Sequence, residues 1–192
     1  MAFPAEELRY SFADALAWDE SDRAEIIDGE IILMAPPPLR EHQDISVEIA
    51  TQLRVFLRGK QCKVYPAPFA VRPFEQDGDR PEDVDTMVEP DITVVCDPAK
   101  LDKYGCKGAP DLVIEILSPS TRTHDLRVKY RLYQKAGVRE YWIVDPKNKT
   151  VQVFTLDDHG YYGAAEVYTA EMKVPVSLWD DFSIDLAGVF PE

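Results

Sequence analysis

The apolar positions along the chain fall into longer stretches with helical spacing and shorter runs typical of strands. The helical pattern predicts three helices, over residues 11–18, 41–58 and 125–136. In the second of these, Ile45, Ile49 and Leu53 recur every four residues and would form one apolar face. Gly59 and Gly137 follow the second and third stretches directly, as glycines that end helices commonly do.

The shorter apolar runs predict the strands. They are AEII and EIIL around Asp28-Gly29, KVYPAPFAV, DITVVC, DLVIEIL, YWIVD, TVQVFTL and a run near EVYTA. The Asp-Gly dipeptide favours a hairpin between the first two, and the prolines of KVYPAPFAV suit an edge strand. DLVIEIL, the helix after it and YWIVD form a β-α-β unit with parallel strands, and the last two runs favour an antiparallel extension. We therefore expect an α/β fold on the border of α+β, with a mixed sheet flanked by helices in one domain spanning residues 1–192.

Composition agrees with a globular chain, while the charge bears on its partners. The 192 residues are 45% hydrophobic, which is enough for a substantial core, and the formal net charge is −14. An acidic total disfavours contact with a phosphate backbone. However, residues 120–149 hold eight basic residues against three acidic ones. This segment could meet phosphates or could be a solvated helix face, and charge alone favours the second interpretation.

The sequence also suggests where the protein is found. No apolar run approaches the roughly 20 residues that a membrane-spanning helix needs, and the N-terminus lacks the pattern of a secretory signal. The three cysteines, Cys62, Cys96 and Cys106, show no paired CxxC spacing. We therefore expect a cytoplasmic protein without a membrane partner, in which all three are free thiols.

One acidic residue stands out in the middle of the apolar strand DLVIEIL. Side chains alternate across a strand, and the neighbours of Glu115 on both faces are nearly all apolar. Because an ionised carboxylate is costly to bury alone, a cation, a network of donors or a metal must lie beside it. For an isolated glutamate, a salt bridge to an arginine is the simpler explanation.

A second acid opens the preceding strand. Asp91 follows Pro90 directly, and if the two strands pair, its carboxylate would lie with Glu115 near one edge of the sheet. Two carboxylates, a backbone carbonyl at Ile116 and water supply the oxygen ligands that Mg²⁺ or Mn²⁺ prefers. For Asp91 alone, a role in a turn or a cap is the alternative.

Pro90-Asp91 followed by Glu115 in an apolar strand resembles the core of the PD-(D/E)XK nucleases. More narrowly, PDLVIEILSPSTRTHDLRVKYRLYQKAGVREYWIVDP is similar to the Uma-type restriction endonucleases found mostly in bacteria, and EIIDGEIILMAPPPLREHQ and EPDITVV fit the same family. The resemblance covers most of residues 24–146. It implies a restriction-endonuclease-like core and a metal-dependent endonuclease, with Mg²⁺ or Mn²⁺ held by Asp91 and Glu115, that hydrolyses phosphodiester bonds of nucleic acid, DNA in the first place.

The chain departs from the superfamily pattern at one position. The pattern places a lysine two residues after the acid, where this chain has Leu117. Lys129, in the helix after the strand, is the expected replacement as the third catalytic residue. Asp125 lies four residues earlier on the same helix face and would support it. Without the resemblance, a surface lysine paired with Asp125 would be the simpler interpretation.

Two further residues are candidates for supporting roles. His42 lies at the N-terminal end of the apolar face of the second helix, where it is either an orienting group of the site or a structural histidine. Glu30 matches the Asp-Gly-Glu segment of the family and is either an acid of the metal site or an ordinary strand-edge residue. By analogy with nucleases that cut both strands, the C-terminal strands would form a homodimer.

Two other functions stay open. The net charge and Leu117 are compatible with a nuclease-like fold that binds a partner without cutting. A pair of carboxylates is also the machinery of enzymes that act on sugars, which would need a tryptophan-lined cleft and no metal.

Overall fold

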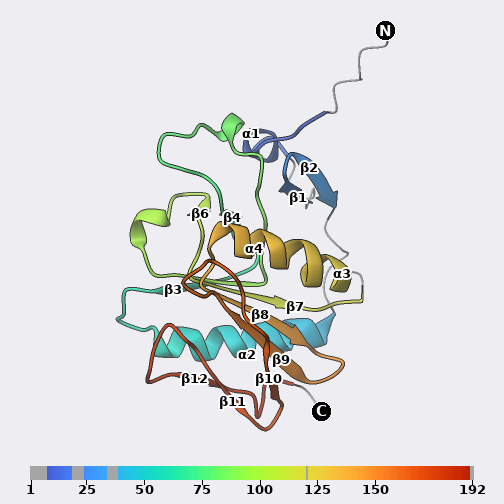
Figure 1. The fold of residues 1–192 in the computed structure, drawn as a ribbon, viewed down its shortest axis with the longest axis vertical. Helices are drawn as coiled ribbons and strands as arrows, with labels where there is room; N and C mark the ends of the chain where they lie inside the picture. Colours follow the sequence, from blue (N-terminus) through green and yellow to red (C-terminus); the bar gives the residue numbers. More distant parts are fainter. Residues whose placement is uncertain (1–7, 19–23, 34–38, 120, 191–192) are drawn as a thin grey trace.

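The computed structural model of the protein describes residues 8–18, 24–33, 39–119 and 121–190, and a six-stranded sheet forms its centre (Figure 1). The order of the strands is β10-β9-β8-β7-β5-β3. Their bounds are β3 (Lys63–Pro66), β5 (Ile92–Val95), β7 (Leu112–Ile116), β8 (Glu140–Asp145), β9 (Thr150–Thr155) and β10 (Glu166–Thr169). The neighbours β7 and β8 run parallel and all other neighbours run antiparallel. The predicted α/β fold with a mixed sheet is confirmed.

Helices cover both faces of this sheet (Figure 1). On one face lies α2 (Arg40–Phe56), and on the other lies a segment made of α3 (Arg122–His124), the π-helical turn η3 (Asp125–Lys129) and α4 (Tyr130–Ala136). The side chains of β7 alternate between two buried clusters, as a strand between two layers must. Ile114 belongs to the cluster under α2, whereas Val113 and Leu117 belong to the cluster under α4.

The predicted helices are confirmed in position and corrected in length. The first is only four residues long, α1 (Phe12–Ala15), with Ser11 at its N-cap. The third begins at Arg122 rather than Asp125 and contains the π-helical turn. It ends at Gly137, which has a φ of 84° that glycine adopts without strain. Across the described ranges, no helix is both long and apolar enough to cross a bilayer.

Short strands surround the central sheet. They are the hairpin β1 (Ala24–Ile27) and β2 (Glu30–Leu33), the parallel pair β4 (Ala70–Arg72) and β6 (Gly105–Lys107), and the pair β11 (Lys173–Pro175) and β12 (Ser183–Asp185), with 3₁₀ turns η1 (Pro81–Asp83) and η2 (Pro98–Lys100). The run KVYPAPFAV is two strands rather than one, because β3 pairs with β5 in the central sheet whereas β4 pairs with β6 outside it. As expected for a strand with prolines, β3 lies at the sheet edge.

The cysteine prediction is wrong for two of the three residues. Cys62 and Cys96 form a disulfide, and only Cys106 is a free, buried thiol. The reason lies in the strand register. Lys63 pairs with Val95 across β3 and β5, so the residues just outside this pair are cross-strand neighbours. No sequence spacing reveals such a pairing, because 34 positions separate the two cysteines.

Candidate active site

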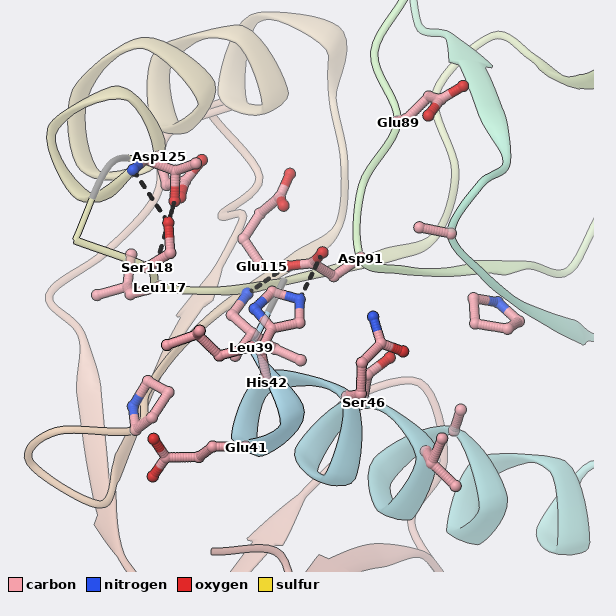
Figure 2. Close-up of a pocket in the computed structure, with 18 of the residues that line it drawn as sticks. Leu39, Glu41, His42, Ser46, Glu89, Asp91, Glu115, Leu117, Ser118 and Asp125 are labelled. Carbon is pink, nitrogen blue, oxygen red and sulfur yellow. Dashed lines mark hydrogen bonds and ion pairs between the residues drawn. The ribbon is translucent and has the colours of Figure 1, made fainter. Parts of the chain in front are cut away.

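The pairing of β5 with β7 brings the two predicted acids together. Ile92 at the start of β5 faces Ile114, so Asp91 directly before it lies beside Glu115. Both carboxylates reach one cavity of ≈ 1900 Å³, which α2 borders from below in Figure 2.

Asp91 is held by two hydrogen-bonding groups from different elements. The Ile116 N–H donates to its Oδ2 at 2.7 Å, and His42 Nε2 lies 3.0 Å from its Oδ1 (Figure 2). The histidine therefore extends from α2 into the cavity beside Asp91. Its Nδ1 is buried and has no hydrogen-bond partner within the described part of the chain. The imidazole is thus fixed through the aspartate alone.

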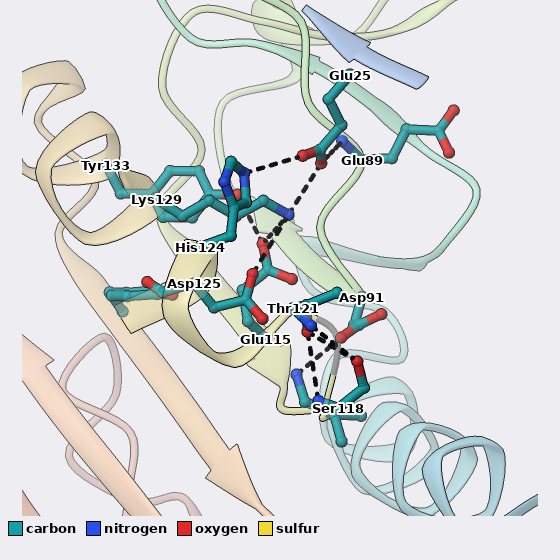
Figure 3. Close-up of polar contacts among 12 residues, drawn as sticks. Glu25, Glu89, Asp91, Glu115, Ser118, Thr121, His124, Asp125, Lys129 and Tyr133 are labelled. Atoms are coloured by element: carbon teal, nitrogen blue, oxygen red, sulfur yellow. Dashed lines mark hydrogen bonds and ion pairs between the residues drawn. The ribbon is translucent and has the colours of Figure 1, made fainter. Parts of the chain in front are cut away.

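Glu115 is buried and bonded to the third helical segment. Lys129 Nζ donates to Glu115 Oε1 at 3.0 Å, and the hydroxyl of Tyr133 donates to the same oxygen at 2.8 Å (Figure 3). The expected approach of the Lys129 ammonium to Glu115 is confirmed. Leu117, at the position of the superfamily lysine, is packed into the apolar cluster under α4. The helix therefore supplies the cation that the strand lacks.

A residue that the sequence analysis missed completes the group. Glu25 in β1 is buried, its Oε1 lies 2.9 Å from Lys129 Nζ, and it accepts the N–H of Glu89 at 2.9 Å (Figure 3). Its Oε2 lies 3.6 Å from Nε2 of His124. Like Glu115, Glu25 is an acid inside an apolar strand, so the same sequence pattern could have identified it as a buried carboxylate.

The other two supporting candidates have different surroundings. Asp125 is buried and its Oδ1 lies 3.9 Å from Lys129 Nζ, so it belongs to the group. Glu30 is exposed on β2 and is not among the described residues that line the cavity. The acid that the hairpin contributes to the cavity is Glu25 instead.

The electrostatics of the group reflect a surplus of acids around one ammonium. Burial raises the pKa of Glu115 well above its usual range, Lys129 opposes this shift, and the neighbouring charges of Asp125, Asp91 and Glu25 add to it. Burial also raises the pKa of Asp125. Burial by itself would lower the pKa of Lys129, but the surrounding carboxylates outweigh it and the pKa lies well above its ordinary value. Lys129 is therefore a permanent cation.

Glu25 differs from Glu115 in the direction of its shift. Burial alone would raise its pKa, yet Lys129, His124 and the Glu89 N–H together lower it to about 2. Glu25 is consequently ionised at neutral pH. Together with Glu115 and Asp125, it surrounds the Lys129 ammonium.

The donor set suits a hard divalent cation, although it does not form a complete cage. Nowhere in the described residues do three or more His, Cys, Asp or Glu side chains converge on a ready-made metal site. Mg²⁺ characteristically needs only one or two carboxylates, because water and substrate phosphates complete its shell. Asp91 and Glu115 provide two, and a cation beside them would offset the surplus negative charge.

A comparison with models of protein families shows to which family the chain belongs. Residues 12–187 match the model of the Uma2 family, described as "Putative restriction endonuclease". The chain belongs to this family. The resemblance seen in the sequence is thereby confirmed, and the match extends beyond it to α1 and β12.

This chain is also similar to two individual proteins. It is 25% identical over 174 residues to a Synechocystis sp. protein named "Uncharacterized protein slr1290", covering 89% of this chain and 87% of the relative. A crystal structure from Anabaena variabilis, described as a putative nuclease belonging to DUF820, superposes with a TM-score of 0.72 at 22% identity. That superposition covers 94% of this chain and 97% of the other. At this identity the structural likeness shows a shared nuclease-like fold.

Proposed function

We propose that the protein is a metal-dependent endonuclease that hydrolyses phosphodiester bonds of DNA. The observation that carries the proposal is the contact between Lys129 Nζ and Glu115 in the cavity that Asp91 also lines. The cavity thus contains two acids and a lysine, which are the groups that the PD-(D/E)XK resemblance implies. The lysine comes from a helix rather than from the strand.

Each residue has a separate task in this proposal. Asp91 and Glu115 would hold Mg²⁺ or Mn²⁺, which when bound neutralises phosphate charge and makes bound water more acidic. Lys129 keeps a positive charge beside the cavity, where it stabilises negative charge on the phosphoryl oxygens. His42 orients Asp91 through their 3.0 Å contact.

A second function is favoured by a specific observation. Both oxygens of Asp91 already have partners, Glu115 Oε1 has two, and no cluster of three ligands exists among the described residues. A protein that binds nucleic acid without cutting it would have no need for a complete metal site. The two functions differ in whether bound nucleic acid is cleaved.

Cleavage assays with divalent cations separate them. Purified protein incubated with plasmid DNA and with single-stranded DNA should cut in Mg²⁺ or Mn²⁺ and should lose activity in EDTA. Asp91→Asn and Glu115→Gln should each reduce the rate by about 100-fold or more, because each replaces a carboxylate that would hold the metal.

The matched control is Glu140→Gln. Glu140 is also a buried strand glutamate, but it bonds to Trp142 and Ser177 away from the cavity. Its substitution should leave the rate per folded molecule unchanged. Cleavage that persists in the Asp91 and Glu115 variants would remove these residues from the mechanism, and binding without cleavage would favour the second function.

A further inference from the structure

The cavity extends far beyond the acids, along the exposed face of α2. Five residues of this face line it at helical spacing and are named here the α2 wall: Val47, Thr51, Arg54, Val55 and Arg58. In Figure 2, α2 runs away from His42 and Ser46 along the lower side of the cavity. The wall thus begins next to the acids and ends past the C-terminus of the helix.

The charged residues of this wall are arginines. Among the lining residues between positions 43 and 68, all of which the structure describes, there is no aspartate or glutamate. The acids of the middle of α2, Asp44 and Glu48, are not among the lining residues. Arg54 and Arg58 are exposed, and neither has a carboxylate partner in the described part of the chain. In a protein of net charge −14, this is a local positive surface.

The wall also exposes apolar surface between its charges. Val47 and Val55 are each 62% exposed, although they are large hydrophobic residues on a helix that packs against the core. Sugars and bases offer apolar contact, whereas phosphates require the arginines. A nucleic acid strand is the partner that presents both at regular intervals.

The distances from the acids to the two arginines fit the spacing of nucleotides in a nucleic acid strand whose scissile phosphate lies at the acids. With a rise of 1.5 Å per residue, Arg54 lies about 18 Å along α2 from His42, and the end of the helix at Phe56, two residues before Arg58, lies about 21 Å from His42. At about 3.4 Å per nucleotide of one strand, Arg54 corresponds to roughly five nucleotides from the cleaved bond and Arg58 to roughly six or more. A short substrate would not reach them.

We propose that the α2 wall is an extended binding subsite for the nucleic acid backbone, in which Arg54 and Arg58 contact phosphates several nucleotides from the scissile one. This proposal rests on the proposed function for the position of that scissile phosphate. It concerns binding, however, and can be measured without any cleavage.

Binding of labelled oligonucleotides by fluorescence anisotropy tests the subsite. In a Glu115→Gln background, Arg54→Ala combined with Arg58→Ala should raise the Kd for an oligonucleotide of about ten nucleotides or more by about tenfold or more. It should leave the Kd for a trinucleotide unchanged. The slope of log Kd against log salt for the long probe should decrease by about two, because two phosphates are no longer neutralised by an arginine. Single-stranded DNA, duplex DNA and RNA of equal length identify which backbone is preferred.

The matched control removes the same charge elsewhere. Arg40→Ala combined with Arg131→Ala also deletes two exposed arginines, neither of which lines the cavity. It should leave the long-probe Kd within about twofold. Circular dichroism of both double variants should show the helix content of the Glu115→Gln protein, because the four arginines are exposed.

The outcomes separate this subsite from the proposed function. Three results would overturn the subsite. They are an equal loss of affinity in both double variants, an equal loss of affinity for long and short probes, and no binding of any probe by the Glu115→Gln protein. Length-dependent binding through Arg54 and Arg58 without cleavage by the native protein would support the subsite and refute the hydrolase. Cleavage at the same rate with and without the two arginines would support the hydrolase and refute the subsite.

Discussion

At the scale of single residues, the site is built on one lysine among several acids. Lys129 Nζ lies 2.9 Å from Glu25 and 3.0 Å from Glu115. Removing the lysine would leave several buried carboxylates without a cation, and breaking a buried ion pair in this way costs about 3–5 kcal/mol. Both glutamates line the cavity and contact the lysine, but their pKa values shift in opposite directions, that of Glu25 downward and that of Glu115 upward.

The stability of the protein should therefore depend on Glu25 in a specific pH window. The pKa of Glu25 is lowered from 4.5 to about 2, so its ionised form stabilises the fold above pH 4.5 and this contribution is lost as the pH falls towards 2. The shift corresponds to roughly 3 kcal/mol. Glu25→Gln should lower the free energy of unfolding by about that amount at pH 7, and the deficit should shrink below pH 4.5. Urea unfolding between pH 7 and pH 3 measures it.

Glu30→Gln is the control for that experiment. Glu30 belongs to the same hairpin but is exposed, and its substitution should change stability by no more than about 0.5 kcal/mol at any pH. A deficit for Glu25→Gln that stays constant from pH 7 to pH 3 would show that packing, and not the carboxylate charge, is what the substitution removes.

At the scale of elements, the segment between β7 and β8 does more than connect parallel strands. Its π-helical turn spans Asp125 to Lys129 and so includes two residues of the site, while His124 before it and Tyr133 after it contact the two glutamates. Such turns are rare and occur frequently at functional sites. The segment must end within a few residues, because Glu140 begins β8. Gly137 makes that ending possible.

Replacing Gly137 should weaken this element through backbone conformation alone. Its φ of 84° is left-handed, and a Cβ there would meet nothing within 4 Å. Gly137→Ala should therefore lower the free energy of unfolding by roughly 1–2 kcal/mol, which a thermal melt detects. Gly163 is equally open but has no positive φ, so Gly163→Ala should be nearly neutral. Equal effects of the two substitutions would contradict this account.

At the scale of the whole molecule, the net charge is −14, but the lining of the cavity is uneven in charge. The acids around Lys129 lie at the end next to Asp91, whereas Arg54 and Arg58 lie at the far end of α2. The disulfide between Cys62 and Cys96 ties the edge strand β3 to β5, the strand that follows Asp91. A single domain, a homodimer and a cytoplasmic location stay predictions.

Reduction of this disulfide should destabilise the whole fold by freeing the unfolded chain. A cross-link over 34 positions restricts the unfolded ensemble by about 3–4 kcal/mol in the chain-entropy model. Dithiothreitol should lower the midpoint of urea unfolding accordingly. In a Cys62→Ser/Cys96→Ser protein the reductant should have no further effect, since buried Cys106 is already a free thiol. A reductant effect of equal size in both proteins would contradict this prediction.

Local patterns determined much of this protein. The spacing of Ile45, Ile49 and Leu53 was sufficient for α2, and alternation in DLVIEIL identified Glu115 as a buried acid. The β-α-β unit followed from the order of its elements. These features depend on neighbours in sequence, which is why the sequence alone could predict them.

Other features were decided by the tertiary structure, because they depend on residues that are distant in sequence. The register of β5 against β7 placed Asp91 beside Glu115, and that of β3 against β5 joined two cysteines expected to be free. Packing of the N-terminal hairpin near η3 brought Glu25, and not Glu30, to Lys129. Sequence patterns indicate which side chains would be costly to bury alone, but only the folded chain determines which partners compensate them.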